Sequence, residues 1–333
     1  MGKMMSDLLI DVHSHPLLPV WIKAFADATG QNVDSVRLAG VPLPRWSEQA
    51  QIDMMDRIGI AASVFSLPGA VTAITGKAAA RFARILNEEI ANIMARHPGR
   101  FGAFAVVPLD DIDLAIEETR YALDVLHLDG VGAATHQTGH YLGEPHFDDW
   151  FAELDRREAT LFVHPVPPPG YVHRPGAPDP SILEFMFDTS RMLLNMVLSG
   201  AKARHQRMKV ISTHAGGTIP YLVSRIGILE PHYGAGGDRP TQSAEQLRDA
   251  FGSFYFDLAG SPWPATLDAI RHLVPPEQLL LGFDYPMMPA ETAVTAIDSF
   301  RAYRGFDAGA RAAIEAGNAA RLLPGLAARM ART

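Results

Sequence analysis

The sequence of 333 residues contains no cysteine. This absence excludes disulfides, thiolate nucleophiles and cysteine-based zinc or iron–sulfur sites. Any metal would have to be held by histidine and carboxylate side chains, and the chain has 13 histidines.

Lysine is scarce, and positive charge is outweighed overall. Arginine and lysine together number 29, against 37 acidic residues, which gives a net charge of −8 and disfavours a nucleic-acid-binding surface. The few lysines are Lys3, Lys23, Lys77, Lys202 and Lys209. No apolar run approaches the ~18 residues of a membrane span, and residues 1–7 do not resemble a signal peptide. We therefore expect a cytoplasmic protein with no membrane partner.

Short apolar runs rich in β-forming residues recur along the chain. Most are continuous rather than alternating, as in strands that are buried on both faces. The expected strands are Leu8–His15, Ala61–Leu67, Gly102–Pro108, Gly130–Thr135, Thr160–Pro165, Lys209–Gly216, Phe254–Gly260 and Leu279–Pro286.

Segments with helical periodicity separate these strands, which implies parallel strands joined by right-handed crossovers. Eight such units predict a single α/β domain of the (β/α)₈ TIM-barrel class over residues 8–325, with tails at 1–7 and 326–333. An open doubly wound sheet is the alternative. A typical barrel needs about 250 residues, so we place insertions after strand one (Pro16–Ile60) and strand five (Val166–Met208).

Histidine or aspartate stands at or near the end of four expected strands. His13 and His15 end the first, His164 the fifth, His214 the sixth and Asp284 the eighth. Each residue alone could be an ordinary hydrogen-bonding or turn-capping group. Together on apolar strands they would be costly to bury unless paired or coordinated. Three histidines and a carboxylate suit Zn²⁺ or another divalent metal.

The same residues resemble the amidohydrolase superfamily. The segment Asn195–Ile226 is similar to the hallmark run of its aminocarboxymuconate-semialdehyde decarboxylase-like branch, which includes hydroxybenzoate and 6-methylsalicylate-type decarboxylases. Met55-Asp56 resembles the branch's Met-Asp helix, and Leu281–Pro286 its Gly-Ser-Asp-Tyr-Pro strand. Phe283 departs from the usual serine, which should narrow or dry that side of the pocket.

The resemblance implies a role for each residue. His13, His15, His164 and Asp284 match metal ligands, and His214 matches the catalytic acid/base, with Asp284 also at the catalytic centre. Binuclear members carry a lysine or glutamate at the end of strand four. Residues 130–136 contain neither, so the resemblance implies one divalent metal, Zn²⁺ first and Mn²⁺ as the alternative.

Aromatic and cationic residues after strand ends are candidates for binding a flat carboxylic acid. Arg225 matches an arginine that can hold a substrate carboxylate, in some members across a dimer interface. The other candidates are Arg45, Arg174, Trp263, Tyr285, Phe65, Tyr171, Met287 and Met288. All could instead serve structure, by packing rim loops or forming a surface ion pair.

The leading hypothesis is a metal-dependent, non-oxidative decarboxylase of an aromatic or unsaturated carboxylic acid, with a hydroxybenzoate-like substrate. The metal would act as a Lewis acid and His214 would transfer the proton. Hydrolysis of a lactone or amide and hydration of an unsaturated acid are the alternatives within the superfamily. A non-catalytic metal-binding or structural protein is the alternative outside it. We expect a small-molecule substrate, no nucleic-acid partner and a homodimer.

Overall fold

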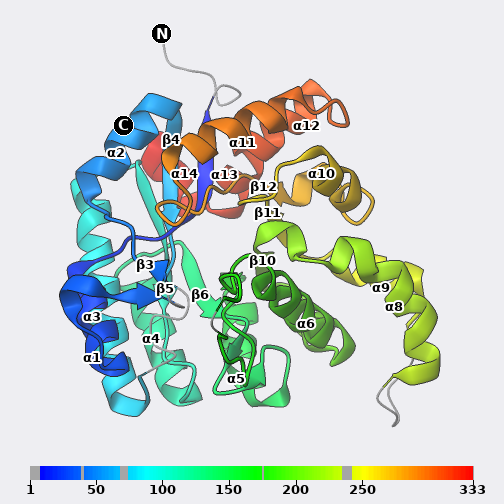
Figure 1. Ribbon diagram of the computed structural model, residues 1–333, viewed down its shortest axis with the longest axis horizontal. Coiled ribbons are helices and arrows are strands. Elements are labelled where there is room, and N and C mark those ends of the chain that lie inside the picture. The colour runs from blue at the N-terminus through cyan, green and yellow to red at the C-terminus, as the bar shows by residue number, and fades with distance from the viewer. Residues whose placement is uncertain (1–7, 39–40, 68–73, 175, 235–241, 333) are drawn as a thin grey trace.

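A computed structural model describes residues 8–38, 41–67, 74–174, 176–234 and 242–332. Its main sheet has eight parallel strands whose spatial order follows the chain order (Figure 1). The strands are β1 (Leu9–Ser14), β4 (Ile60–Phe65), β5 (Phe101–Val106), β6 (Gly130–Ala134), β9 (Thr160–His164), β10 (Lys209–Ser212), β11 (Tyr255–Asp257) and β12 (Leu279–Leu280).

The first and last strands meet and close the sheet. Val12 N donates to Leu281 O at 2.9 Å, and Asp284 N donates to His13 O at 2.8 Å. A further parallel bridge pairs Ser14 with Tyr285. The predicted (β/α)₈ barrel is therefore confirmed, and the open-sheet alternative is wrong.

Helices surround the strands. They are α1 (Pro19–Thr29), α2 (Glu48–Ile58), α3 (Gly76–Arg96), α4 (Ile112–Asp124), α5 (Asp148–Arg156), α6 (Glu184–Leu198), α7 (Ala201–Arg204), α8 (Ile219–Tyr233), α9 (Ala244–Phe251), α10 (Pro264–Ile270), α11 (Ala290–Ala302), α12 (Ala308–Ala312), α13 (Asn318–Leu322) and α14 (Pro324–Met330). The remaining strands of the described residues form two short antiparallel pairs: β2 (Arg37–Leu38) with β3 (Val41–Pro42), and β7 (His136–Gln137) with β8 (His140–Tyr141).

Helix α2 shows how local sequence sets these boundaries. The side chain of Ser47 caps its first turn by accepting from Ala50 N, and Gly59 ends it in the left-handed conformation, with φ of 89°. None of the described helices combines the length and apolar character required to cross a bilayer.

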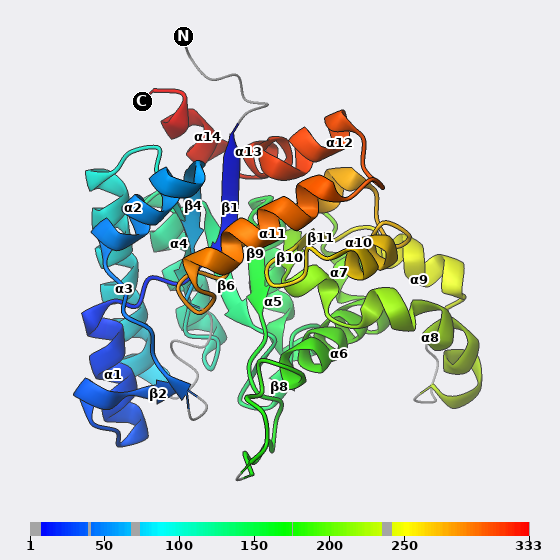
Figure 2. The same cartoon turned by 45° about the horizontal axis from the view of Figure 1, so that its top comes forward.

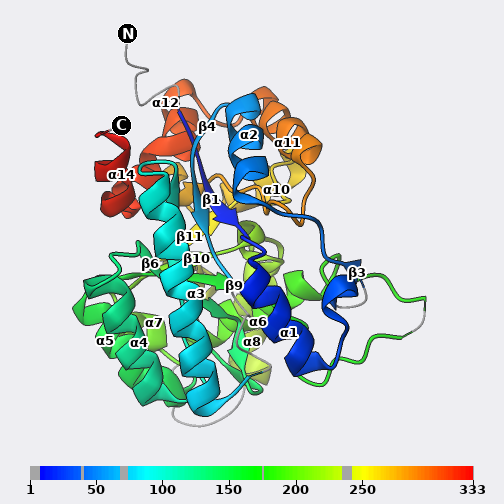
Figure 3. The same ribbon diagram turned by 90° about the vertical axis from the view of Figure 1, so that its left-hand side faces the viewer.

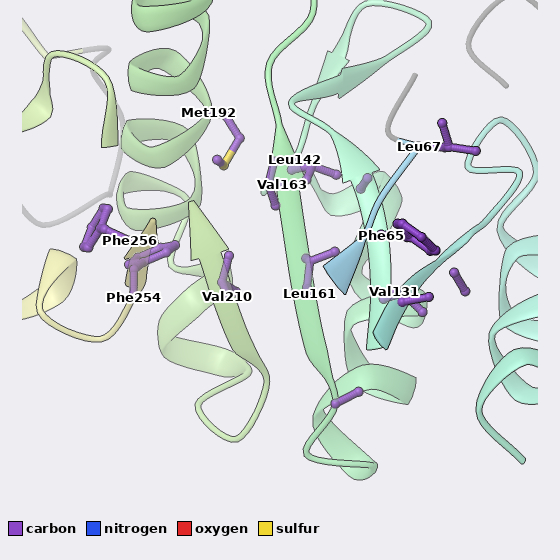
Figure 4. Packing of buried hydrophobic residues seen from close by; sticks show 14 of the residues in the cluster. Phe65, Leu67, Val131, Leu142, Leu161, Val163, Met192, Val210, Phe254 and Phe256 are labelled. Atoms are coloured by element: carbon purple, nitrogen blue, oxygen red, sulfur yellow. The ribbon is translucent and has the colours of Figure 1, made fainter. Parts of the chain in front are cut away.

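The apolar core has two parts because successive residues of a strand point to opposite faces. The outer part, between strands and helices, includes Phe65, Leu161 and Met192 (Figure 4). The inner part fills the barrel and includes Phe104 and Phe162, whose rings stack at a centroid distance of 4.9 Å.

Helices α13 and α14 cover the end of the barrel at which the strands begin (Figure 2). Leu323 and Leu326 are fully buried and belong to the inner core. Arg329 forms an ion pair with the buried Asp129, which precedes β6. These helices close this end of the barrel, and the opposite end stays open. The N-terminal residues 1–7, expected to form a tail, lie outside the described residues, whereas much of 326–333 is packed helix.

Two long connections follow β1 and β9. The first contains α1, the short 3₁₀ helix η2 (Val33–Ser35), β2, β3 and α2, and the second separates β9 from α6. Figure 3 shows α1, β3 and the segment after β9 on the same side of the barrel. Their identity as insertions stays a prediction.

Candidate metal centre

Four side chains from three strand ends converge at the open end of the barrel. His13 and His15 come from the end of β1, His164 ends β9 and Asp284 follows β12. One ligand atom from each lies within 4.8 Å of the others, so the group could hold a metal ion. Solvent reaches the group from one side, because the side chain of Asp284 is 17% exposed while that of His13 is fully buried.

The hydrogen-bonding contacts of the three histidines with groups outside the cluster all involve Nδ1. His15 Nδ1 lies 2.9 Å from Ser66 O, and His164 Nδ1 lies 2.7 Å from Pro165 O. A carbonyl oxygen can only accept, so both Nδ1 atoms carry hydrogen and both Nε2 atoms offer lone pairs in the neutral rings. His13 Nδ1 faces the carboxylate of Asp257 at 2.9 Å, which favours the same tautomer.

These electron-rich atoms point at one another. His13 Nε2 lies 3.1 Å from His15 Nε2, and His15 Nε2 lies 2.9 Å from Asp284 Oδ1. Lone pairs at such distances repel unless a cation compensates them. A proton on one ring would compensate the repulsion in one contact, whereas a divalent ion would compensate it throughout the group. The donor set of three imidazoles and one carboxylate therefore fits a divalent metal.

The electrostatics follow from burial and mutual contact. Burial opposes ionisation of Asp284, but the neighbouring His13 and His15 outweigh it and hold its pKa well below the usual range. Burial and the surrounding histidines lower the pKa of His164 strongly. Burial lowers the pKa of His13. Burial also opposes protonation of His15, but the hydrogen bond and charge of Asp284 outweigh it and raise its pKa. The group is therefore built around one ionised carboxylate.

His214 differs from the other three histidines. Its Nδ1 is buried without a hydrogen-bond partner in the described residues, and its Nε2 lies 3.8 Å from Asp284 Oδ2. Its ring centroid is 5.3 Å from that of His164. The backbone of His214 is left-handed, with φ of 54°, a conformation that non-glycine residues rarely adopt. This turn, directly after β10, places the imidazole beside the cluster without a fixed tautomer.

Sequence reasoning missed Asp257, although it also stands at a strand end. It terminates β11, is fully buried, and contacts both His13 and the backbone of His214. Burial opposes ionisation of Asp257, but the adjacent His13 outweighs it and lowers the pKa. Asp284 is a candidate because it lies near the end of an expected strand. The same criterion applies to Asp257 within the expected strand Phe254–Gly260.

A second missed group lies behind the cluster. The amide of the buried Gln51, in α2, donates to Ser14 Oγ at 2.6 Å and to Ser63 Oγ at 3.2 Å. Ser63 Oγ donates to Asp11 Oδ2 at 2.6 Å, and Gln51 accepts from Trp46 Nε1 at 2.6 Å. This network links α2 to β4 and to β1, the strand that carries His13.

The family model described as amidohydrolase matches residues 10–325. This chain belongs to the amidohydrolase family.

The relatives of this amidohydrolase with curated descriptions include two fungal enzymes. It is 35% identical over 292 residues to a 6-methylsalicylic acid decarboxylase of Aspergillus aculeatus, covering 86% of each chain. It is 32% identical over 305 residues to the 6-methylsalicylic acid decarboxylase of Penicillium expansum, covering 88% of this chain and 90% of that enzyme.

Solved structures share the fold. A dihydroxybenzoic acid decarboxylase from a Polaromonas species superposes with a TM-score of 0.77 at 21% identity, covering 96% of this chain and 97% of that one. That crystal contains bound manganese and the inhibitor 2-nitroresorcinol.

The amidohydrolase brings only part of the predicted substrate-binding set together. Trp263 and Met288 line one cavity with Phe283, beside the segment that leads to Asp284. Tyr285 is half-buried against the outer core. Phe283 is itself buried in that core, and its expected effect on the pocket stays a prediction.

The remaining candidates lie elsewhere. Phe65 is fully buried and stacks on Phe101 at a centroid distance of 4.5 Å, facing the helices rather than the cluster. Arg45 is exposed, as is Arg225 on α8, and neither forms an ion pair within the described ranges. In the segment after β9, the hydroxyl of the half-buried Tyr171 contacts His173. The sequence pattern gave no way to tell which strand-end residues turn outward.

Proposed function

We propose that this amidohydrolase is a metal-dependent, non-oxidative decarboxylase of a hydroxybenzoate-like acid, with 6-methylsalicylate as the leading substrate. The observation that carries the proposal is the cluster of three histidines and Asp284 with His214 beside it. The relationship to the 6-methylsalicylic acid decarboxylases supports the choice of substrate.

We assign His13, His15, His164 and Asp284 as ligands of one divalent metal. When bound, the ion supplies Lewis acidity that draws electron density from a hydroxyl or carboxylate oxygen of the substrate. The end of β6 supports a single ion, because Thr135 follows the strand there and its hydroxyl donates to the buried Asp188. We propose Zn²⁺ as the native ion and Mn²⁺ as the alternative.

His214 delivers the proton in this proposal. As the carbon–carbon bond to the carboxylate breaks, the electron pair of that bond takes a proton from the imidazolium form of His214, and CO₂ leaves. The neutral imidazole then regains a proton from solvent. Two features support this role: His214 lies beside Asp284, and no hydrogen bond in the described residues fixes its Nδ1. General acid catalysis of this kind contributes typically 10²–10⁴-fold.

We assign Trp263 and Tyr285 to contact with the aromatic ring, because both follow the strand ends that carry Asp257 and Asp284. Arg225 lies exposed on α8 between Tyr221 and Ile228, whose exposed fractions are 85% and 64%. We propose that this face pairs two subunits in a homodimer and that Arg225 meets the substrate carboxylate of the other subunit. Arg45 is the alternative carboxylate contact, and the proposed location is the cytoplasm.

The test is a substrate panel. Protein loaded with zinc or manganese is incubated with ortho-hydroxybenzoates, including 6-methylsalicylate, and CO₂ release is followed. We expect release that depends on the metal. A panel of lactones and amides is run in parallel, and turnover there without any CO₂ release would replace the decarboxylase assignment with a hydrolase. Absence of bound metal and of any rescue by added metal would contradict both.

A further inference from the structure

One buried carboxylate contacts both a proposed metal ligand and the proposed proton donor. Asp257 Oδ2 lies 2.9 Å from His13 Nδ1. Asp257 Oδ1 accepts the backbone N–H groups of His214 and Ala259, each at 3.0 Å. The side chain is completely inaccessible to solvent, so these contacts are not exchanged with water.

We propose that Asp257 is a positioning residue that sets the tautomer of His13 with one oxygen and the backbone of His214 with the other. This inference rests on the proposed metal-dependent function. Asp257 would thereby fix the ligand and the proton donor relative to each other, without touching the substrate.

Two carboxylates face the ring of His13, and Asp257 is the nearer: its Oδ2 lies 2.9 Å from Nδ1, whereas Asp284 Oδ1 lies 3.5 Å from Nε2. The shorter contact favours hydrogen on Nδ1. The ring is fully buried and meets Phe162 edge-on at a centroid distance of 5.1 Å. An ionised carboxylate can only accept, so it holds the hydrogen on Nδ1 and leaves the Nε2 lone pair toward the cluster. Carboxylates that accept from the second nitrogen of a ligand histidine orient the ring and raise its basicity.

The second oxygen acts on a backbone rather than on a ring. His214 adopts a left-handed conformation with φ of 54°, and Ala215 after it has the same φ. Such a conformation persists only where the surroundings hold it. The N–H of His214 donates to Asp257 Oδ1, and this bond ties the turn to the end of β11.

Replacing Asp257 with asparagine separates the two contacts. Backbone N–H groups can only donate, so the asparagine Oδ1 keeps the His214 and Ala259 bonds. Its Nδ2 hydrogens then face His13 Nδ1, which must become an acceptor and place its hydrogen on Nε2. We expect Asp257→Asn to lower metal affinity 10- to 100-fold, measured by chelator competition, while the fold is retained.

The direct readout is the tautomer. Nitrogen-15 spectra of the metal-free protein should show hydrogen on His13 Nδ1 in the parent and on Nε2 in Asp257→Asn, with His13→Gln identifying the signals. The parent spectrum alone tests the proposal if the variant does not fold. Hydrogen on Nε2 in the parent, or unchanged metal affinity and tautomer in a folded Asp257→Asn, would overturn it.

Further variants separate positioning from loss of a buried charge. Asp129→Asn removes a buried carboxylate at the far end of the barrel, and it should change stability but not metal affinity. Excess metal should restore turnover in Asp257→Asn but not in Asp257→Ala, which also loses the His214 contact. The affinity and tautomer measurements need no substrate, so they stand even if the decarboxylase assignment fails.

Discussion

Asp11 Oδ1 accepts the backbone N–H of Phe283 at 3.0 Å, across the seam where the barrel closes. The same oxygen accepts from His13 N at 3.0 Å. One carboxylate therefore joins the strand that carries His13 and His15 to the segment that carries Asp284. The relative position of these proposed ligands depends on that link as well as on the strand ladder.

Asp11 should make the stability of the metal-free protein depend on pH. Burial raises the pKa of Asp11 to about 7, far above the usual range of an aspartate. Between its unfolded and folded pKa, the folded chain holds a proton that the unfolded chain releases. The free energy of unfolding therefore falls as pH rises through this window, by about 1.4 kcal/mol per pH unit from this one group.

Asp11→Asn removes this contribution and keeps an acceptor for both backbone N–H groups. The quantity to measure is the melting temperature of the variant minus that of the parent, in the presence of chelator. We expect this difference to rise between about pH 4.5 and about pH 7 and to stay constant at higher pH. A difference that is constant with pH would contradict the assignment of the proton to Asp11.

His164 and His214 should separate metal binding from proton transfer. His164→Ala removes a proposed ligand, so we expect loss of bound metal by elemental analysis, and turnover falls with it. His214→Ala should retain the metal and lose turnover by about 10²–10⁴-fold. A metal-free His214→Ala, or a fully active one, would reverse the assignments.

Gly282 should be sensitive to a single added methyl group. A Cβ there would lie 2.8 Å from the Cβ of His13 and 3.3 Å from that of Ala259. His13 or the strand must shift, so Gly282→Ala should weaken metal binding, measured by chelator competition. Gly132→Ala is the matched control, because its nearest contacts would be at an ordinary 3.6 Å. Equal losses of metal affinity in both variants would indicate a general barrel effect.

Metal removal should destabilise the fold. The cluster exists only in the folded chain, so a metal that binds it stabilises by mass action, about 2.7 kcal/mol at a free concentration of 100 times Kd. We expect the melting temperature to fall on chelation and to rise with added zinc or manganese. His164→Ala should abolish that response. A melting temperature indifferent to metal in the parent protein would argue against an ion at this site.

The barrel could be predicted because buried parallel strands carry a strong apolar signal. All eight expected strands are present, even the glycine-rich β6. Helix α1, by contrast, lies in an apolar segment inside a long connection, where no strand–helix alternation identifies it. Helices α11–α14 follow the last strand, so the alternation does not identify them either, although Leu326 completes the inner core.

The grouping of the four cluster residues could be predicted because parallel strands end at one rim. The direction in which an individual side chain points could not be predicted from its position near a strand end. Phe65 is a substrate-binding candidate by its place near a strand end, yet its neighbour Val64 fills the inner core and Phe65 faces the helices. The hydrogen bonds that distinguish His214 from the other histidines depend on Ser66, Pro165 and Asp257, whose proximity only the folded chain reveals.

The contact between β1 and the segment after β12 also has a consequence for the kinetics of folding. His13 and Asp284 are brought together only when strands from opposite ends of the chain meet, and bringing such distant segments together is entropically costly and slow. Each earlier strand pair can form without completing the cluster. Binding of a metal ion during refolding would therefore report when the barrel closes. A metal-sensitive probe would follow this closure step, which spectroscopy of secondary structure does not isolate.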